Sequence, residues 1–221
     1  MTGKYKTELH CHTSEASACA SECGADTVKQ YIECGYTTLV VTNHFSPYQM
    51  GEMPYDRFVK NLFDAAETAR KAAGDRLYVL TGMELKLRGS GNEYLVFGVT
   101  EKMLMDRTDI FDMSLDEVHR YFNGYGLPLI QAHPMRYGIT MVDPELVDGY
   151  EVLNAHSAWN SHNDIAHLWA KSVGGEGKIL TAGTDHHDHV NTPTAGILTD
   201  EPITNSDELI RVLQSGHYDI F

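Results

Sequence analysis

The chain has 221 residues, of which 42% are hydrophobic, and its formal net charge is −14 at pH 7. This length and composition suit one α/β barrel with a full apolar core. The acidic balance argues against a basic groove for long nucleic acid, because phosphate backbones are bound mainly by Lys and Arg. Three bound dications would still leave a net charge of about −8 on the same count. We therefore expect no long nucleic acid partner.

Thiols and apolar segments bear on the compartment. All four cysteines (Cys11, Cys19, Cys23 and Cys34) lie near the start of the chain, without the second downstream pair that a structural zinc knuckle needs. They are expected to be reduced. Residues 1–6 lack the apolar stretch of a secretory signal, and no apolar run approaches the length of a membrane span. These features predict a cytoplasmic protein with no membrane partner.

Apolar runs alternate with amphipathic stretches along the chain, which is typical of a parallel sheet whose strands are joined by helices. The apolar runs predict strands near 6–12, 37–43, 77–85, 94–99, 128–133, 149–155 and 178–184. The amphipathic stretches predict helices near 25–34, 55–73, 114–124, 160–173 and 205–215. Ser114 and Glu117 form a predicted capping box. No linker or repeat interrupts the pattern, so we expect a single domain over residues 1–221.

Side chains that can bind metals recur where the predicted strands end. His10 and His12 end the first strand, and strand alternation projects both to one face while Cys11 turns away. Five later strands end in His44, Glu84, His133, His156 and the run Asp185-His186-His187. Barrel enzymes place their chemistry at the C-terminal ends of their strands. The pattern therefore predicts one shared metal site at that edge.

Five motifs, in order over essentially the whole chain, resemble those of the PHP (polymerase and histidinol phosphatase) family. They are His10-x-His12, Thr42-Asn43-His44, Gly82-Met83-Glu84, Ala132-His133-Pro134 and Gly183-Thr184-Asp185-His186-His187. The resemblance implies a distorted, TIM-like (β/α)7 barrel. It also implies two or three divalent metal ions at the C-terminal ends of the strands, and hydrolysis of phosphate esters.

The resemblance assigns the ligands residue by residue. The first metal would be held by His10, His12, Glu84 and Asp185. The second would share Glu84 as a bridge and add His133 and His156, and the third would use His44 and His187. Strand alternation lets His187 face the site while His186 faces away, but the choice among His186, His187 and His189 stays open. The mixture of imidazoles and carboxylates suits Zn, Mn or Fe and does not choose among them.

Two departures from the family pattern concern the third metal. Family members often carry a further His or Asp in the loop after H-x-H, where this chain has Glu15, Ala18 and Cys19. Glu15 is our candidate ligand there, and Cys19 is a weaker one. Asn43 stands where the family usually has Asp, which removes a negative charge. Occupancy of the third site is therefore left open.

Roles in catalysis follow from the same resemblance and from chemistry. Asp185 is predicted to hold the nucleophilic water as well as a metal, and His187 or His44 to protonate the leaving oxygen. Arg136 is predicted to bind the phosphate by a bidentate contact, with Lys86 as a weaker candidate for phosphate binding.

The leading hypothesis is a phosphoesterase acting on a small phosphorylated molecule. One alternative is a non-catalytic metal-binding PHP module. Another is an amidohydrolase that cleaves C–N bonds, for which Arg136 would have no obvious use. The substrate, the identity of the ions and the oligomeric state are not readable from this sequence.

Overall fold

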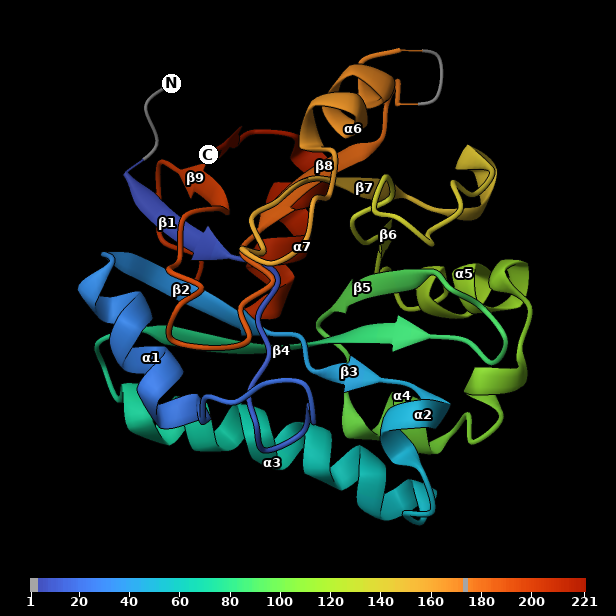
Figure 1. Ribbon diagram of the computed structural model, residues 1–221, viewed down its shortest axis with the longest axis horizontal. Coiled ribbons are helices and arrows are strands. Elements are labelled where there is room, and N and C mark those ends of the chain that lie inside the picture. The colour runs from blue at the N-terminus through green and yellow to red at the C-terminus, as the bar shows by residue number, and fades with distance from the viewer. Residues whose placement is uncertain (1–3, 173–174) are drawn as a thin grey trace.

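The computed structural model describes residues 4–172 and 175–221, which form an α/β fold around one curved sheet (Figure 1). The strands are β1 (Tyr5–Glu8), β2 (Tyr36–Val41), β3 (His44–Phe45), β4 (Tyr78–Lys86), β5 (Glu93–Phe97), β6 (Leu129–Gln131), β7 (Gly149–Asn154), β8 (Ile179–Gly183), β9 (Ile197–Thr199) and β10 (Asp219–Ile220). The helices are α1 (Gly24–Glu33), α2 (Pro47–Met50), α3 (Tyr55–Ala73), α4 (Glu101–Met105), α5 (Leu115–Asn123), α6 (Asn163–Ala170) and α7 (Ser206–Ser215). Short 3-10 helices cover Ile110–Asp112 and Pro144–Leu146.

The sheet order is β10-β9-β1-β2-β4-β5-β6-β7-β8, with β3 paired to β4. Beyond the ends of β1 and β8 the two segments approach each other again. The His12 N–H donates to the His186 carbonyl (2.9 Å), and Cys11 and His186 form a parallel bridge. The sheet is therefore a nearly closed barrel, and its closing seam lies at the C-terminal ends of β1 and β8. The predicted barrel fold is confirmed.

The direction of one strand differs from the prediction. The pairs β1/β2, β2/β4, β6/β7 and β7/β8 are parallel, but β5 is antiparallel to both β4 and β6. The reason is the short connection between β4 and β5, because a parallel crossover needs a dozen or more residues. The start of β5 therefore lies at the same edge as the end of β4, with Lys86 opposite Glu93.

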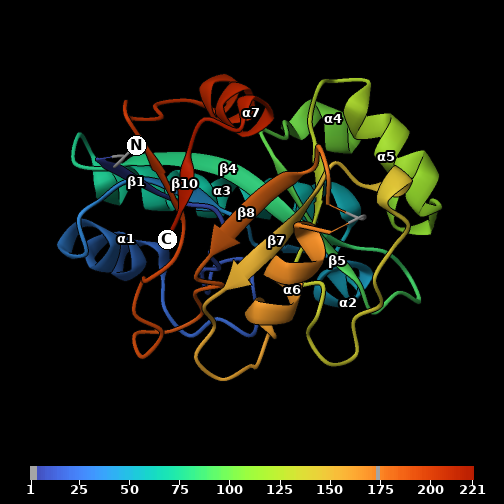
Figure 2. The same cartoon turned by 90° about the horizontal axis from the view of Figure 1, so that it is seen from above.

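Helices cover the outer face of the sheet. In Figure 1, α1 and α3 lie beside β2 and β4, and Figure 2 shows α6 over β7. The long helix α3 forms because its apolar residues recur at helical spacing and are buried, and it ends before Gly74 at φ 56°. The capping box of Ser114 and Glu117 is present at the start of α5. The predicted helix 160–173 is shorter, and Val173 lies outside the described residues.

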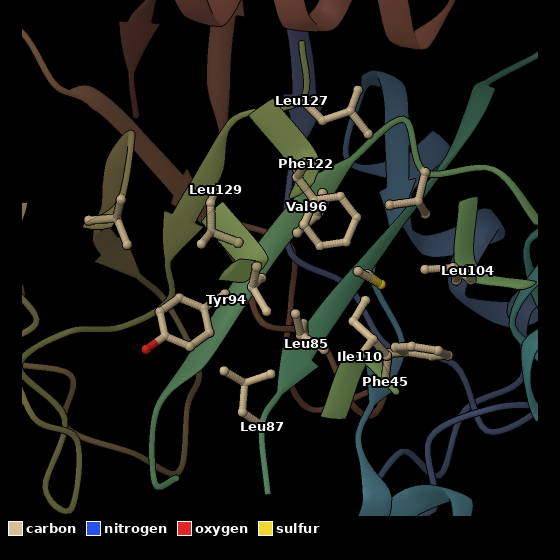
Figure 3. Close-up of a cluster of buried hydrophobic side chains, with 14 of the residues drawn as sticks. Phe45, Leu85, Leu87, Tyr94, Val96, Leu104, Ile110, Phe122, Leu127 and Leu129 are labelled. Atoms are coloured by element: carbon tan, nitrogen blue, oxygen red, sulfur yellow. The ribbon is translucent and has the colours of Figure 1, made fainter. Parts of the chain in front are cut away.

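A large apolar cluster packs behind the strands that carry the polar edge. Figure 3 shows Leu85 of β4, Leu87 just after this strand, Tyr94 and Val96 of β5, and Leu129 of β6 pointing into it. Phe45 directly follows His44 and is fully buried in this cluster, with its ring 5.1 Å from that of Phe58 and 4.9 Å from that of Phe111. Core packing therefore fixes the backbone that presents His44.

We predict that Phe45→Ala lowers the free energy of unfolding by about 3–5 kcal/mol, because it removes a buried aromatic ring and leaves a cavity. Urea unfolding followed by circular dichroism measures the change. Tyr48→Ala is the matched control, since the Tyr48 side chain is 68% exposed. A loss for Phe45→Ala no greater than for Tyr48→Ala would contradict the assigned packing.

Candidate metal centre

The closing seam brings His10 and His12 beside Asp185. The His10 Nε2 atom lies 3.1 Å from His12 Nε2, 3.2 Å from Glu84 Oε1 and 3.3 Å from Asp185 Oδ1. Four polar atoms thus converge. The Nε2 atoms of His10 and His12 are so close that at most one of them can carry a proton. Ligand atoms about 2.0–2.2 Å from one ion lie roughly 3–3.5 Å apart, so these separations fit a bound cation.

Two buried groups of three residues have ligand atoms within 4.8 Å of one another. One is His10, His12 and Asp185, and the other is His10, Glu84 and His133. His133 Nε2 lies 3.1 Å from Glu84 Oε1 and 3.5 Å from Glu93 Oε2. Within the described part of the chain, Glu84 Oε2 is buried without a hydrogen-bond partner, although His44 Nδ1 lies 2.8 Å away. A buried carboxylate oxygen without such a partner fits a metal ligand.

Two carboxyl groups at this edge, those of Glu84 and Asp185, have lowered pKa values. Burial alone would raise the pKa of Glu84 and Asp185, but the neighbouring His10 charge helps to hold both pKa values well below their usual range. Burial opposes protonation of His10, yet the carboxylates of Asp185, Glu151 and Glu84 raise its pKa. Burial together with His44 and His187 lowers the pKa of His12, which favours the neutral imidazole that metals bind. A cation at His10 Nε2 would take the place of a proton there.

The backbone at two of these residues is strained. His133 has φ 29° and Asp185 has φ 54°, a region that L-residues other than Gly rarely adopt. Such a conformation costs on the order of 1–3 kcal/mol and persists where the surroundings enforce it, often at functional sites. Here it aims both side chains at the same group of polar atoms.

A third group consists of His12, His44 and His187. The His12 ring centroid lies 4.3 Å from that of His44 and 4.3 Å from that of His187. His187 Nδ1 donates to the carbonyl of Asp185 at 2.8 Å, which leaves Nε2 free. Cys19 lies beside this group, and although partial burial opposes it, hydrogen bonding to His187 and His44 lowers the pKa of the Cys19 thiol to about 6.

The structure does not bring Glu15 to the metal centre. Its carboxylate accepts hydrogen bonds from the Gly24 N–H at 2.9 and 3.0 Å, at the start of α1. Anionic side chains are stabilised at helix N-termini. Glu15 is therefore not placed to bind a metal ion at this centre, whereas Cys19 lines the cavity.

His156 lies in the cavity but outside the Glu84 group. Its Nδ1 accepts a hydrogen bond from the Ala158 N–H at 3.1 Å, and its ring centroid lies 5.0 Å from that of His187. Burial lowers its pKa. The second set of ligands expected from the resemblance, with His133 and His156 around Glu84, is thus assembled only in part.

The choice among the three clustered histidines is clear from the geometry. His186 is buried away from the centre, with Nε2 2.7 Å from Glu22 Oε2 and Nδ1 2.9 Å from the Asn191 carbonyl oxygen. His189 is exposed. His187 is the one that faces the cavity.

An open cavity of about 610 Å³ lies over the centre. Arg136 and Lys86 line it together with Glu84, Asp185 and His133. Arg136 Nη2 donates to Asp185 Oδ2 at 2.8 Å, while Lys86 Nζ lies 3.1 Å from Glu93 Oε1. The two side chains predicted to bind phosphate, Arg136 and Lys86, therefore lie at the cavity wall, each beside a carboxylate.

Three carboxylate residues of the site, Glu8, Glu93 and Glu151, were not predicted from the sequence. Glu93 lies near His44 and Glu84, and an antiparallel reading of β5 would have placed it at this edge. Glu151 Oε1 lies 2.8 Å from His10 Nδ1, and Glu8 accepts the N–H groups of His10 and Thr184. Burial raises the pKa of Glu8 to about 7. The available signal for Glu151 was a carboxylate inside a mostly apolar strand.

Comparisons with known proteins bear on the fold. No family model and no curated protein match the chain. A two-domain protein from Bacteroides vulgatus that contains a predicted PHP-like metal-dependent phosphoesterase matches with a TM-score of 0.69 at 14% identity, over 98% of this chain and 64% of that one. An Endonuclease Q complex matches with a TM-score of 0.64 at 9% identity, over 96% and 56%. An amidohydrolase from Chromobacterium violaceum with bound sulfate and no metal matches with a TM-score of 0.62 at 13% identity, over 98% and 97%.

The chain spans less than two thirds of the first two of these proteins. It has the fold of PHP-like metal-dependent phosphoesterases, so the resemblance seen in the motifs is confirmed at the level of the fold. No helix in residues 4–172 and 175–221 has the length and apolar character of a membrane span.

One expectation is corrected by these comparisons. We expected no long nucleic acid partner, but the Endonuclease Q structure contains a 27-mer duplex with an abasic lesion at its active site. A protein with this fold can therefore hold duplex DNA. Net charge is a property of the whole surface and does not describe the local potential at one cavity.

We predict that Glu151→Ala weakens metal binding about 10–100-fold, because the carboxylate that orients His10 is lost. Glu151→Gln should weaken it less, since its amide oxygen can still accept from His10 Nδ1. Isothermal titration with Zn²⁺ measures the affinity, with Glu145→Ala as an exposed control. Equal affinities for Glu151→Ala and the control would exclude an orienting role for Glu151.

Proposed function

We propose that the protein is a metal-dependent phosphoesterase that hydrolyses a phosphate ester of a small molecule. The observation that carries the proposal is the meeting, in one cavity, of groups of metal-binding residues with Arg136 and Lys86. Carboxylates and imidazoles hold divalent cations, and cationic side chains near them bind phosphate oxygens. Zn, Mn and Fe are the candidate ions.

The ligands can be divided by the number of free ring nitrogens. His10 Nδ1 contacts Glu151, so His10 offers only Nε2 and serves one ion, with His12 and Asp185. A second ion would then be held by Glu84 and His133, with Glu93 nearby. We propose Glu84 as the bridge between the two, because its carboxylate contacts the ligands of both. His44 and His187 would hold a third ion.

Cations bound there would lower the pKa of water and offset the negative charge of the transferring phosphoryl group. Asp185 directs Oδ1 toward the histidines and Oδ2 toward Arg136, so it lies between the ligand group and the phosphate-binding side chain. The Arg136 guanidinium is held by Asp185, Asn154 and Ser161, which orients it before substrate arrives. Asp185 and His187 are our candidates for contact with the reacting atoms.

Cleavage of a C–N bond is the second candidate, because the amidohydrolase from Chromobacterium violaceum shares the fold. Arg136 and Lys86 favour the phosphoesterase, since a neutral amide or ring substrate offers no anionic oxygen for either side chain to bind. A non-catalytic metal-binding module is the third candidate, and it predicts metal binding without turnover.

Turnover of p-nitrophenyl phosphate by chelator-treated protein tests the proposal. We expect activity to appear on addition of Zn, Mn or Fe, and Glu84→Gln to lose bound metal and activity together, because a neutral amide is a poor bridge. Elemental analysis reports the metal content. Unchanged metal content in Glu84→Gln would argue against the bridge. Metal binding without turnover of phosphomonoesters or an oligonucleotide would refute the phosphoesterase.

We predict that Arg136→Ala raises KM for phosphomonoesters by on the order of tenfold to a hundredfold, because a hydrogen bond to a charged group is lost. Bound metal should stay unchanged in elemental analysis. Arg120→Ala is the control, since Arg120 is exposed on α5 and does not line the cavity. Loss of metal or unfolding in Arg136→Ala would show that Arg136 has a structural role instead.

A further inference from the structure

Aromatic side chains gather at the mouth of the cavity over the metal centre. Five Tyr and Trp side chains are exposed among the described residues: Tyr48, Tyr78, Tyr125, Tyr137 and Trp159. Tyr137 and Trp159 line this cavity, with exposed fractions of 96% and 60%. Tyr48 lines a neighbouring hollow of about 510 Å³ that shares His44 and Lys86 with the cavity. Exposed aromatic rings at one opening are typical of a binding surface, and the proposed metal chemistry uses none of them.

The two loops that carry Tyr137 and Trp159 are joined by the side chain predicted to bind phosphate. Tyr137 directly follows Arg136, and Trp159 lies two residues before Ser161. Arg136 Nη2 and Nε donate to Ser161 Oγ at 3.1 and 3.3 Å, so the guanidinium group bridges the two loops. A phosphate bound by Arg136 would therefore lie between the segments that present the two rings.

Further hydrogen bonds fix the backbone of each loop. In the first loop, the Thr140 N–H donates to Asn92 Oδ1 and the Thr140 carbonyl accepts from Asn92 Nδ2, both at 2.8 Å. In the second loop, the Ser157 N–H donates to Asn191 Oδ1 at 2.8 Å. Tyr and Trp side chains have only two torsions each, so rings on a fixed backbone lose little conformational entropy when they bind a ligand.

The floor and the mouth of the cavity differ in character. Asp185 and His133 lie buried at the polar floor, whereas Tyr137 and Trp159 are exposed at the mouth. A phosphate bound at the floor would thus be separated from the rings. An aryl phosphate carries its ring directly on the ester oxygen, whereas a nucleoside monophosphate has a sugar between the phosphate and the base. The second arrangement matches a polar floor below an aromatic mouth.

From this arrangement we infer that the substrate is a nucleoside monophosphate whose unpaired base stacks against Tyr137 and Trp159. The inference rests on the proposed function, because it names the substrate class of the same site. Stacking of a base on an aromatic side chain strengthens binding by about tenfold to a hundredfold. The cavity of about 610 Å³ has the size of sites for small organic ligands.

Other phosphate esters match the site less well. A sugar phosphate has no flat ring and would leave Tyr137 and Trp159 exposed to water, and a base within a duplex is already stacked on its neighbours. In the reaction, the oxygen of water bonds to phosphorus and the bond from phosphorus to the sugar oxygen breaks. The sugar oxygen takes a proton, so a nucleoside and inorganic phosphate are released.

Inhibition of p-nitrophenyl phosphate turnover tests the inference on the full-length protein, loaded with the ion that supports turnover. Adenosine 5′-monophosphate or its 3′ isomer should inhibit competitively at about tenfold to a hundredfold lower concentration than ribose 5-phosphate, which has the sugar and phosphate without the base. Trp159→Ala and Tyr137→Ala should weaken inhibition by the nucleotide and leave inhibition by ribose 5-phosphate unchanged. Trp159→Phe should retain nucleotide inhibition, because a phenyl ring still stacks. Tyr125→Ala is the control, since Tyr125 is exposed but does not line the cavity.

Fluorescence gives a readout that needs no turnover. The chain has two tryptophans, and Trp169 is half-buried with its ring centroid 4.6 Å from that of Tyr150. Adenosine monophosphate should therefore quench the tryptophan fluorescence of chelator-treated wild-type protein and not that of Trp159→Phe, while ribose 5-phosphate should quench neither. A single-stranded trinucleotide with the same terminal phosphate distinguishes a free nucleotide from the end of a strand.

Equal inhibition by the nucleotides and ribose 5-phosphate, or equal loss of both in Trp159→Ala, would overturn the inference while the phosphoesterase stands. Absence of turnover with every phosphate ester would instead overturn the proposed function. In that case quenching of Trp159 by the nucleotide would still support a base-binding site, and unchanged fluorescence would exclude it.

Discussion

Carboxyl groups buried at one end of a barrel lose their hydration, so each needs positive charge or hydrogen-bond donors close by. In this protein Glu84, Asp185 and Glu151 lie around the single ring of His10. Much of the local structure serves this requirement. Backbone N–H groups point at Glu8 and Glu151, Arg136 contacts Asp185, and His44 contacts Glu84. The cluster of acidic side chains creates a negative electrostatic potential that a divalent cation would neutralise.

The general architecture could be read from the sequence, because it depends on periodicity that each segment carries by itself. Apolar runs indicated most of the strands β1, β2, β4, β5, β6, β7 and β8, and amphipathic spacing indicated the main helices. Histidines and acids at strand ends indicated an edge where they would meet. His187 rather than His186 faces the cavity, but β8 has already ended at Gly183, so strand alternation does not account for this placement.

What could not be read depends on direction, loop geometry and contacts between distant segments. The reversed direction of β5 depends on a short connection, and it places Glu93 at the edge. The role of Glu15 was misjudged because sequence distance from His12 does not reveal that its carboxylate turns toward Gly24. Glu151 looked like an ordinary strand residue until β7 was placed against His10. The inference about nucleic acid failed because a whole-chain charge was applied to one local surface.

Few interactions close the barrel between β1 and β8. Between β1 and β8 the seam consists of a single bridge at Cys11 and His186, a few backbone hydrogen bonds, and the Glu8 carboxylate that accepts N–H groups from both sides. His10 and His12 lie on the β1 side of this seam, and Asp185 lies on the β8 side. An ion bound between them would join the two sides of the seam, so that loss of the ion would also weaken the closure of the barrel. Storage conditions that strip metals would then act on the architecture itself as well as on its chemistry.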